Sequence, residues 1–270
     1  FGACTTPSAS REQFTPRSST RMSFAHAGAP FLSHLRLRGD RVQPRVHPFT
    51  LPIVARGLSL EFTTPVTFFV GENGSGKSSL LEAIAWSCGF SAHGGSRDHQ
   101  FGDAHDGHAL GQALALSWRE RATDGFFLRA ETFHQFASQL DASGSSFGRY
   151  GGRSFHTRSH GEAFLALFEH RFERGLFLLD EPEAALSPQR QLAFLRLMHT
   201  LARRRVAQFI VATHSPMLLC LPGARVLGFD DGCIAETCGD DTEHVRLTRD
   251  FLNHPGRYLR HLLDEHDAVD

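Results

Sequence analysis

Residues 71–78, GENGSGKS, carry glycine, lysine and serine at the spacing of a phosphate-binding loop, G-x-x-x-x-G-K-[ST]. Glycines let such a loop fold back with its N–H groups pointing inward, and the start of the next helix adds partial positive charge. These features favour a polyphosphate, with Lys77 reaching the β- and γ-phosphates and Ser78 ligating Mg²⁺. The alternative is a flexible Gly/Ser turn that matches by chance. It is disfavoured because an apolar run, Val66 to Val70, precedes the motif and a helical pattern follows it.

An acidic pair, Asp180-Glu181, follows the apolar run from Leu176 to Leu179. The end of a buried strand is the right place for a carboxylate that holds Mg²⁺ opposite Ser78, and we predict this role for Asp180. Glu181 is expected to point the other way along the pleat and to orient or deprotonate the attacking water. Acidic strand ends are common by themselves, but this one lies downstream of an intact phosphate loop.

A histidine, His214, follows the next apolar run, Phe209 to Ala212. Ligands of open α/β sheets bind at the carboxyl ends of the strands, so His214 is predicted to contact the γ-phosphate or the attacking water. A single histidine in a turn is more often structural. The position of this one, beside the two other candidate strands, favours a function.

The segment RSHGE, residues 158–162, allows two interpretations. Ser159 and Glu162 form an S-x-x-E capping box for a helix predicted over 162–174, which alone would explain both residues. A capped helix start with Gly161 beside it is also a seat for an anion. The sequence leaves both interpretations open.

Alternating strands and helices must bring these candidates together. The alternation predicts a mostly parallel sheet with helices on both faces. The predicted strands are 35–38, 58–62, 66–70, 113–118, 126–129, 176–179 and 206–212, and the predicted helices are 77–88, 131–141, 162–174 and 188–204.

Composition sets wider limits. A chain of 270 residues with 41% hydrophobic content can build one large α/β domain or two small ones. The net charge of −1 gives no global basic field for nucleic acid, and no run of 18 apolar residues predicts membrane insertion. The five cysteines form no CxxC pair and indicate a reducing compartment, so we expect a cytoplasmic protein.

The first 25 residues are rich in Ser, Thr, Arg and Pro, and we expect a disordered tail. The first methionine is Met22, which suggests an upstream extension, although a native tail explains the segment equally well. No signal peptide is predicted, because a compact apolar segment is missing.

In combination, the phosphate loop, FLLDEPE (177–183) and THSP (213–216) resemble the ABC-type ATPase superfamily. They are most similar to stand-alone bacterial AAA-family predicted ATPases related to SMC, recombination-repair and overcoming-lysogenization ATPase heads. ALSPQRQ (185–191) lies where that family has its D-loop, and the resemblance covers about residues 30–262. It implies an α/β P-loop NTPase with a mostly parallel central sheet, flanking helices, a small antiparallel β subdomain and a helical or loop insertion. We expect a single domain over 26–270, with the insertion at about 91–160.

The same resemblance implies the ligands and the site. ATP and Mg²⁺ are expected, with two protomers sandwiching two ATP molecules in a nucleotide-dependent homodimer. The implied catalytic residues are Glu181 and His214, and the implied metal ligands are Ser78 and Asp180. The implied nucleotide-binding residues are Glu72, Asn73, Gly74, Ser75, Gly76, Lys77, Ser78, Ser79, Ser159 and Gly161.

Two departures from the family stand out. The common LSGGQ signature is replaced by RSHGE, which keeps only the serine and the second glycine. The glutamine that the family carries between the phosphate loop and the signature is replaced by Glu131, with Gln135 and Gln139 as nearby alternatives.

A soluble ATPase is therefore the leading functional hypothesis. A DNA-associated repair or phage-defence ATPase head ranks second: no long coiled-coil insertion separates 90 from 158, and the basic run Arg203-Arg204-Arg205 more simply complements a helix end. The nucleotide-binding subunit of a membrane transporter ranks third, because Glu131 and the atypical signature argue against it. A DNA or protein partner stays open.

Overall fold

The computed structural model describes residues 28–91, 95, 107–122, 124–131, 133, 168 and 172–264. Within these residues, six strands form a central sheet in the order β5-β6-β7-β3-β8-β9. All neighbouring pairs are parallel except β8 and β9, which form an antiparallel hairpin. The strands are β3 (Val66–Val70), β5 (Gly125–Arg129), β6 (Gly175–Asp180), β7 (Ala207–Ala212), β8 (Arg225–Asp230) and β9 (Cys233–Thr237).

A second, smaller sheet is antiparallel and has the order β2-β1-β4. Its strands are β1 (Leu32–Leu37), β2 (Ser59–Glu61) and β4 (Leu114–Trp118). Short helical turns η1 (Gly39–Arg41) and α1 (Pro52–Ala55) lie between β1 and β2 in the chain. The expected α/β class, with a mostly parallel central sheet and a small antiparallel β subdomain, is thus confirmed.

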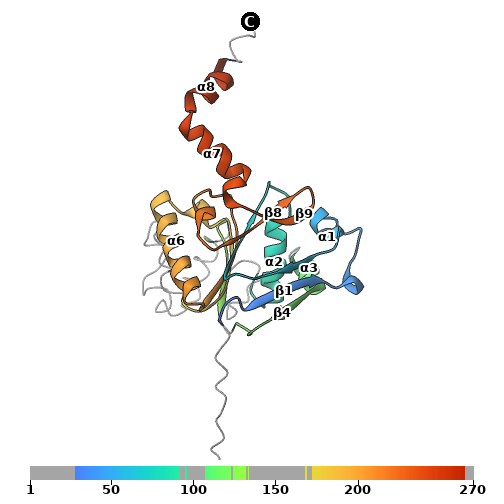
Figure 1. Cartoon of the computed structure of the whole chain (residues 1–270). Coiled ribbons are helices and arrows are strands. Elements are labelled where there is room, and N and C mark those ends of the chain that lie inside the picture. Colours follow the sequence, from blue (N-terminus) through green and yellow to red (C-terminus); the bar gives the residue numbers. More distant parts are fainter. Residues whose placement is uncertain are drawn as a thin grey trace, which may run out of the picture.

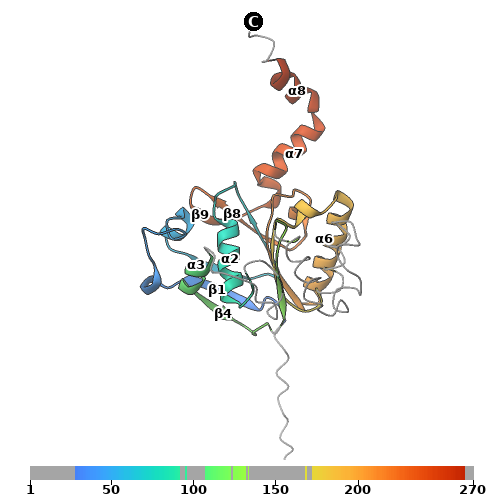
Figure 2. The ribbon, with the colours of Figure 1, turned by 180° about the vertical axis from the view of Figure 1, so that it is seen from behind.

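Helices cover both faces of the central sheet (Figures 1 and 2). On one face lie α2 (Lys77–Ser87) and α3 (Gly107–Ala113) with the antiparallel sheet, and on the other lies α6 (Pro188–Arg203). Three short helical turns follow strands of this sheet: η4 (Pro182–Ala185) follows β6, η5 (Leu218–Cys220) follows β7, and η6 (Gly239–Asp241) follows β9. The last two helices, α7 (Glu243–Asn253) and α8 (Pro255–Asp264), project away from the body in both views.

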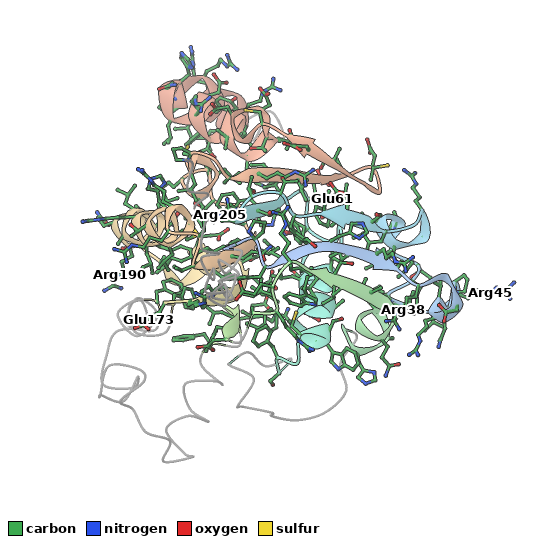
Figure 3. The ribbon with its side chains drawn as sticks, turned by 60° about the horizontal axis from the view of Figure 1, so that its bottom comes forward. Arg38, Arg45, Glu61, Glu173, Arg190 and Arg205 are labelled. Carbon is green, nitrogen blue, oxygen red and sulfur yellow. The ribbon has the colours of Figure 1, made fainter. Side chains whose placement is uncertain are left out.

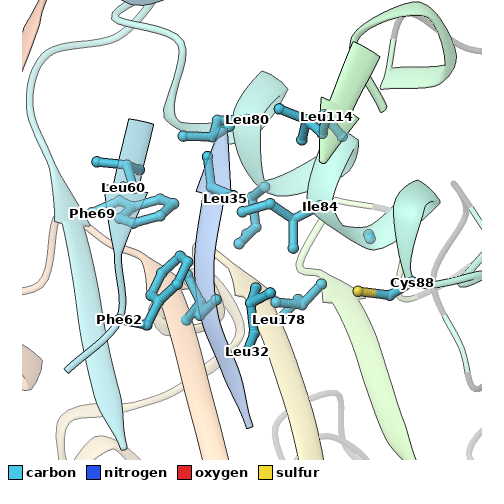
Figure 4. Close-up of a cluster of buried hydrophobic side chains, with 14 of the residues drawn as sticks. Leu32, Leu35, Leu60, Phe62, Phe69, Leu80, Ile84, Cys88, Leu114 and Leu178 are labelled. Atoms are coloured by element: carbon cyan, nitrogen blue, oxygen red, sulfur yellow. The ribbon is translucent and has the colours of Figure 1, made fainter. Parts of the chain in front are cut away.

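The core divides into two layers because successive strand residues face opposite sides of the sheet. The layer under α6 is rich in phenylalanine: the ring of Phe168 stacks on Phe194 at 4.3 Å, and Phe177 stacks on Phe172 at 4.2 Å. The other layer combines aliphatic residues with further phenylalanines and lies between α2, the antiparallel sheet and the central sheet (Figure 4). Its members include Leu35, Leu60, Leu80, Ile84 and Leu178. This double burial explains why the central strands read as continuous apolar runs.

The predicted strands lie close to the observed ones, but several elements were not predicted. The additional elements are α1, α3, β8, β9, α7 and α8. The helix predicted over 131–141 and the tail over 1–25 lie largely or wholly outside the described residues. Of the predicted helix 162–174, residues 168 and 172–174 are described. The N–H of Phe172 donates to the carbonyl of Phe168 at 3.2 Å, the spacing of a helical turn.

Arginines border the body on several sides (Figure 3). Arg38 and Arg45 lie beyond the antiparallel sheet, whereas Arg190 lies at α6. In the basic run after α6, Arg204 is the C-cap and Arg205 adopts a left-handed conformation with φ of 54°. This agrees with the interpretation of the run as a helix end. Among the described helices, none is both long and apolar enough to cross a membrane.

Candidate functional site

The loop between β3 and α2 needs glycine at positions 71 and 76. Gly71 has φ of +143°, and a Cβ atom there would lie 2.7 Å from the carbonyl oxygen of Phe229. Gly76 is the left-handed N-cap of α2, and a Cβ atom there would lie 2.7 Å from Cδ1 of Ile53. Both positions therefore combine a positive φ with close neighbours, which only glycine accommodates without strain. The helix begins directly after this loop, at Lys77.

Lys77 is 4% exposed, and its side chain folds back over the loop. Its Nζ donates to the carbonyls of Gly71 and Glu72, each at 2.7 Å, and lies 3.4 Å from Oγ of Ser75. Burial lowers the pKa of Lys77, while the carboxylates of Glu181, Asp180 and Asp230 act in the opposite direction. A preformed ammonium donor thus lies at the start of α2, where an anion is favoured.

Ser78 and Asp180 meet although 102 residues separate them. The Oγ of Ser78 donates to Oδ1 of Asp180 at 2.9 Å. Burial raises the pKa of Asp180 to about 6, and Arg129 and the Ser78 hydrogen bond partly offset that effect. A hydroxyl and a carboxylate side by side form a donor set of hard oxygen atoms, which Mg²⁺ prefers. The two residues predicted as metal ligands therefore lie together, and their chemistry fits the ion.

Arg129, which belongs to no motif of the sequence, completes the surroundings of Asp180. In the register of β5 and β6, Arg129 pairs with Asp180, and its Nε lies 3.4 Å from Oδ2 of that residue. Its guanidinium also contacts Oε1 of Glu82 at 2.6 Å and Oε2 of Glu131 at 3.6 Å. Glu131, which replaces the glutamine of the family, extends beside Arg129 with 79% of its side chain exposed. Only the strand register reveals these neighbours.

The conformation of Glu181 differs from the expectation. The prediction that it points the other way along the pleat is wrong, because β6 ends at Asp180 and Glu181 adopts a left-handed backbone with φ of 49° and ψ of 50°. The turn is held by the N–H of Glu181, which donates to the carbonyl of Ala212 at 2.9 Å. A non-glycine residue in this region carries strain. Its side chain remains 41% exposed, and Oε1 lies 3.6 Å from Nε2 of His214.

The segment after β7 is held by Glu183, the last residue of FLLDEPE, for which no role was predicted. Oε1 of Glu183 accepts from the backbone N–H groups of His214, at 2.6 Å, and Ser215, at 3.1 Å. Burial raises the pKa of Glu183, and the hydrogen bonds to its own backbone and to His214 oppose this rise. Oγ of Ser215 also donates to Oε1 of Gln191 at 2.6 Å, so α6 contacts the same segment. The position of His214 is thus set from two sides.

A second histidine, His244, lies beside His214. The Nδ1 of His214 and the Nε2 of His244 are 2.8 Å apart, and the ring centroids are separated by 4.7 Å. Burial is the main cause that lowers the pKa of His214, with further contributions from Lys77 and His244. No motif surrounds His244 in the sequence, and α7, which carries it, was not among the predicted helices.

Two open pockets border the loop between β3 and α2. One pocket of about 580 Å³ is lined by Glu72, Asn73, Glu181, His214 and His244. Another, of about 370 Å³, shares Glu72 and Asn73 and adds Gly74 and Ser75. The half-buried Ser79 lies on α2 and lines neither of these two pockets. Ser159 and Gly161, predicted to contact nucleotide, lie outside the described residues.

Two family models match the chain, and both are described as AAA domains. One matches residues 46–117, which contain the phosphate loop. The other, described as "AAA domain, putative AbiEii toxin, Type IV TA system", matches residues 162–219, which contain Asp180, Glu181 and His214. No curated protein gives a significant match.

Solved structures similar to this chain include ATPase heads and cassettes. The SMC head domain from Thermotoga maritima is 18% identical, with a TM-score of 0.42, over 77% of this chain and 98% of that one. A bacterial ABC transporter cassette in a dimeric structure is 17% identical, with a TM-score of 0.41, over 67% of this chain and 89% of that one. A putative metal-chelate type ABC transporter is 18% identical, with a TM-score of 0.42, over 68% of this chain and 76% of that one.

The expected family therefore agrees with the two domain models, with the fold and with the loop geometry. A strand, a glycine-rich loop and a helix that begins at a lysine occur in the order that the motif requires. The matches to two AAA-domain models, on either side of residues 118–161, together with the fold and the loop geometry, support an ABC/AAA-type P-loop ATPase.

Proposed function

We propose that the chain binds ATP–Mg²⁺ at residues 72–79 and hydrolyses the γ-phosphate bond. The contact between Ser78 and Asp180, 2.9 Å across 102 residues of sequence, carries this proposal. This contact supports the proposal, because Ser78 and Asp180 offer the hard oxygen atoms that Mg²⁺ prefers, and the Asp180 carboxylate also acts electrostatically on Lys77. Ser78 and Asp180 would hold Mg²⁺, which would supply positive charge to neutralise the negative charge that develops during phosphoryl transfer.

In this proposal the protein groups divide the work. Lys77 and the N–H groups of residues 72–79 bind the phosphates, and Ser78 and Asp180 hold the metal. Glu181 accepts a proton from the attacking water, since its carboxylate is partly exposed at the pocket. His214 donates from Nε2 to the γ-phosphate. The strained backbone of Glu181 fixes the direction of its side chain before the substrate arrives.

We further propose that the domain over 26–270 acts as a nucleotide-bridged homodimer in the cytoplasm. Ser159 and Gly161 of one protomer would contact the phosphate bound by the other, as the family resemblance implies. The five cysteines without a CxxC pair support a reducing compartment.

The test compares nucleotide binding and ATP hydrolysis in the wild type, Lys77→Ala and Glu181→Gln. Lys77→Ala should weaken ATP affinity by about 10- to 100-fold, because it removes charged hydrogen bonds to phosphate. Glu181→Gln should keep ATP affinity but lower the turnover by roughly 10²- to 10⁴-fold, because the amide cannot accept a proton. Titration calorimetry and phosphate release are the measurements.

A matched control uses the other end of the same strand. Glu173 is an exposed carboxylate just before β6, whereas Glu181 follows it directly. Glu173→Gln should bind and hydrolyse ATP as the wild type does. Unchanged ATP affinity in folded Lys77→Ala would refute the phosphate-loop assignment, and wild-type turnover in Glu181→Gln would place the base elsewhere.

A further inference from the structure

Two histidines from distant segments meet at the 580 Å³ pocket that Glu72, Asn73 and Glu181 also line, which we call the phosphate pocket. His214 follows β7, and His244 is the second residue of α7, 30 residues further along the chain. The 2.8 Å between Nδ1 of His214 and Nε2 of His244 is a hydrogen-bond distance. When both rings are neutral, one of these nitrogens carries the proton and the other accepts it. The direction of this bond fixes the tautomer of His214.

The other ring nitrogen of His214, Nε2, indicates which histidine donates in this hydrogen bond. Nε2 of His214 is buried, has no hydrogen-bond partner among the described residues, and lies 3.6 Å from Oε1 of Glu181. A lone pair on Nε2 would face the negative carboxylate, whereas a proton there is attracted to it. In the favoured arrangement, Nε2 of His244 therefore donates to Nδ1 of His214, and His214 carries its own proton on Nε2. Burial lowers the pKa of His214, which is consistent with a neutral ring.

The turn that carries His244 is anchored to the body. Val245, the next residue, is 4% exposed and belongs to the core layer under α6. The hydroxyl of Thr242, the N-cap of α7, donates to the carbonyl of Gly239 at 2.7 Å. Beyond this turn, α7 and α8 project away from the body (Figure 1). His244 is therefore held at the place where the projecting helices join the site.

We propose that His244 is a positioning residue for ATP hydrolysis, which holds His214 in the orientation and tautomer that present an N–H donor to the phosphate pocket. The inference rests on the proposed function and deepens it. A donor that is fixed before the reaction needs no reorganisation when charge develops on the phosphate. A partner on the second ring nitrogen is the usual means of fixing a functional histidine. The first turn of α7 thereby becomes part of the catalytic arrangement.

Kinetics of three full-length variants test this role. His244→Leu removes the donor and should lower kcat on the order of 10- to 100-fold, with little change in the KM for ATP. His244→Gln keeps an amide N–H donor and should recover most of the wild-type kcat. The control is His254→Leu, directly after α7, where the exposed ring of His254 lies 3.1 Å from Oδ1 of Asp250 and far along the helix from His244. The control should hydrolyse ATP at the wild-type rate.

Nitrogen-15 NMR of histidine-labelled protein gives a readout that does not depend on turnover. The ring signals that disappear in His214→Gln belong to His214, and in the wild type they should show the proton on Nε2. His244→Leu should shift these signals toward a mixture of tautomers, and His244→Gln should not.

A wild-type signal with the proton on Nδ1, or a wild-type kcat in His244→Leu, would overturn the inference. So would a His244→Gln protein that stays folded yet is as slow as His244→Leu. If the wild type hydrolyses no ATP, the proposed function fails, and the NMR result still decides whether His244 sets the tautomer.

Discussion

At the scale of single residues, Asp180 lowers the stability of the fold at the position where a metal ligand is predicted. Its side chain is 7% exposed, and burial raises its pKa to about 6 from an ordinary 3.8. A carboxyl group whose pKa is raised in the folded protein stabilises the fold least when it is ionised. The free energy of unfolding therefore falls as the pH rises from about 4 through about 6. The ionised carboxylate of Asp180 thus destabilises the fold without ligand, and a bound cation would stabilise it.

The first prediction concerns Asp180→Asn without ligand. The shift from 3.8 to about 6 corresponds to about 3 kcal/mol at full ionisation. Asp180→Asn should thus be more stable than the wild type at pH 8 and show no such gain at pH 4. Urea unfolding at both pH values measures the difference, and the same variant should bind ATP weakly in the presence of Mg²⁺. The control is Asp40→Asn, in the exposed turn η1, where a surface substitution should change the free energy of unfolding by less than about 0.5 kcal/mol. An equal stability difference at both pH values would contradict the prediction.

At the scale of elements, the loop after β3 is shaped by its approach to β8. Gly71 lies against the backbone of Phe229, whereas a Cβ added at Gly74, which also has a positive φ, would meet no atom within 4 Å. Both glycines therefore have a positive φ, but of the two only Gly71 also packs closely against the backbone of Phe229.

Alanine at each position should separate these two features by experiment. Gly74→Ala should lower the free energy of unfolding by roughly 1–2 kcal/mol, the cost of a left-handed backbone. Gly71→Ala should lower the free energy of unfolding by roughly 1–3 kcal/mol more than Gly74→Ala does. The extra loss comes from overpacking, because the carbonyl of Phe229 cannot move aside as a side chain would. Chemical denaturation measures both values. Equal losses would mean that the loop moves away from β8 at no cost.

Elements also cooperate in holding His214. Glu183 in η4 accepts from the backbone after β7, Gln191 in α6 accepts from Ser215, and His244 in α7 contacts the ring. Three separate elements of the fold thus converge on one segment. This convergence explains how a residue outside regular secondary structure can keep a defined orientation.

At the scale of the whole molecule, the proposed mechanism needs a second copy of the chain. The predicted contact residues, Ser159 and Gly161, lie outside the described residues, so association in solution is the direct test. Glu181→Gln should sediment as a monomer without nucleotide and as a dimer with ATP–Mg²⁺. Adding Gly161→Arg should prevent dimerisation and leave ATP binding by the monomer unchanged, because the bulky side chain blocks the phosphate of the other subunit.

The dimer test also distinguishes the two interpretations of RSHGE. If Ser159 and Glu162 form only a capping box, Ser159→Ala costs about 1 kcal/mol of stability in every nucleotide state. An ATP-induced dimer that persists with Gly161→Arg would leave only that interpretation. A Glu181→Gln protein that stays monomeric at saturating ATP would refute the shared site.

The sequence by itself determined the parts of this protein that depend on local order. The loop 71–78 is contiguous, and the apolar runs before Asp180 and His214 are long enough to indicate buried strands. Parallel strands present their carboxyl ends at one edge, so the meeting of Ser78 with Asp180 followed from these runs. The strands β3, β6 and β7 were predicted within about one residue for the same reason.

The tertiary structure alone decided the neighbours that complete the site. Arg129 reaches Asp180 through the register of β5 on β6, which no spacing in the sequence encodes. Glu181 leaves the pleat because its N–H bonds to Ala212 on the adjacent strand. His244 meets His214 because the chain returns to the site before α7 begins. Each of these contacts joins segments that are distant in sequence, and packing sets their geometry, whereas local periodicity reports only which face of an element is buried.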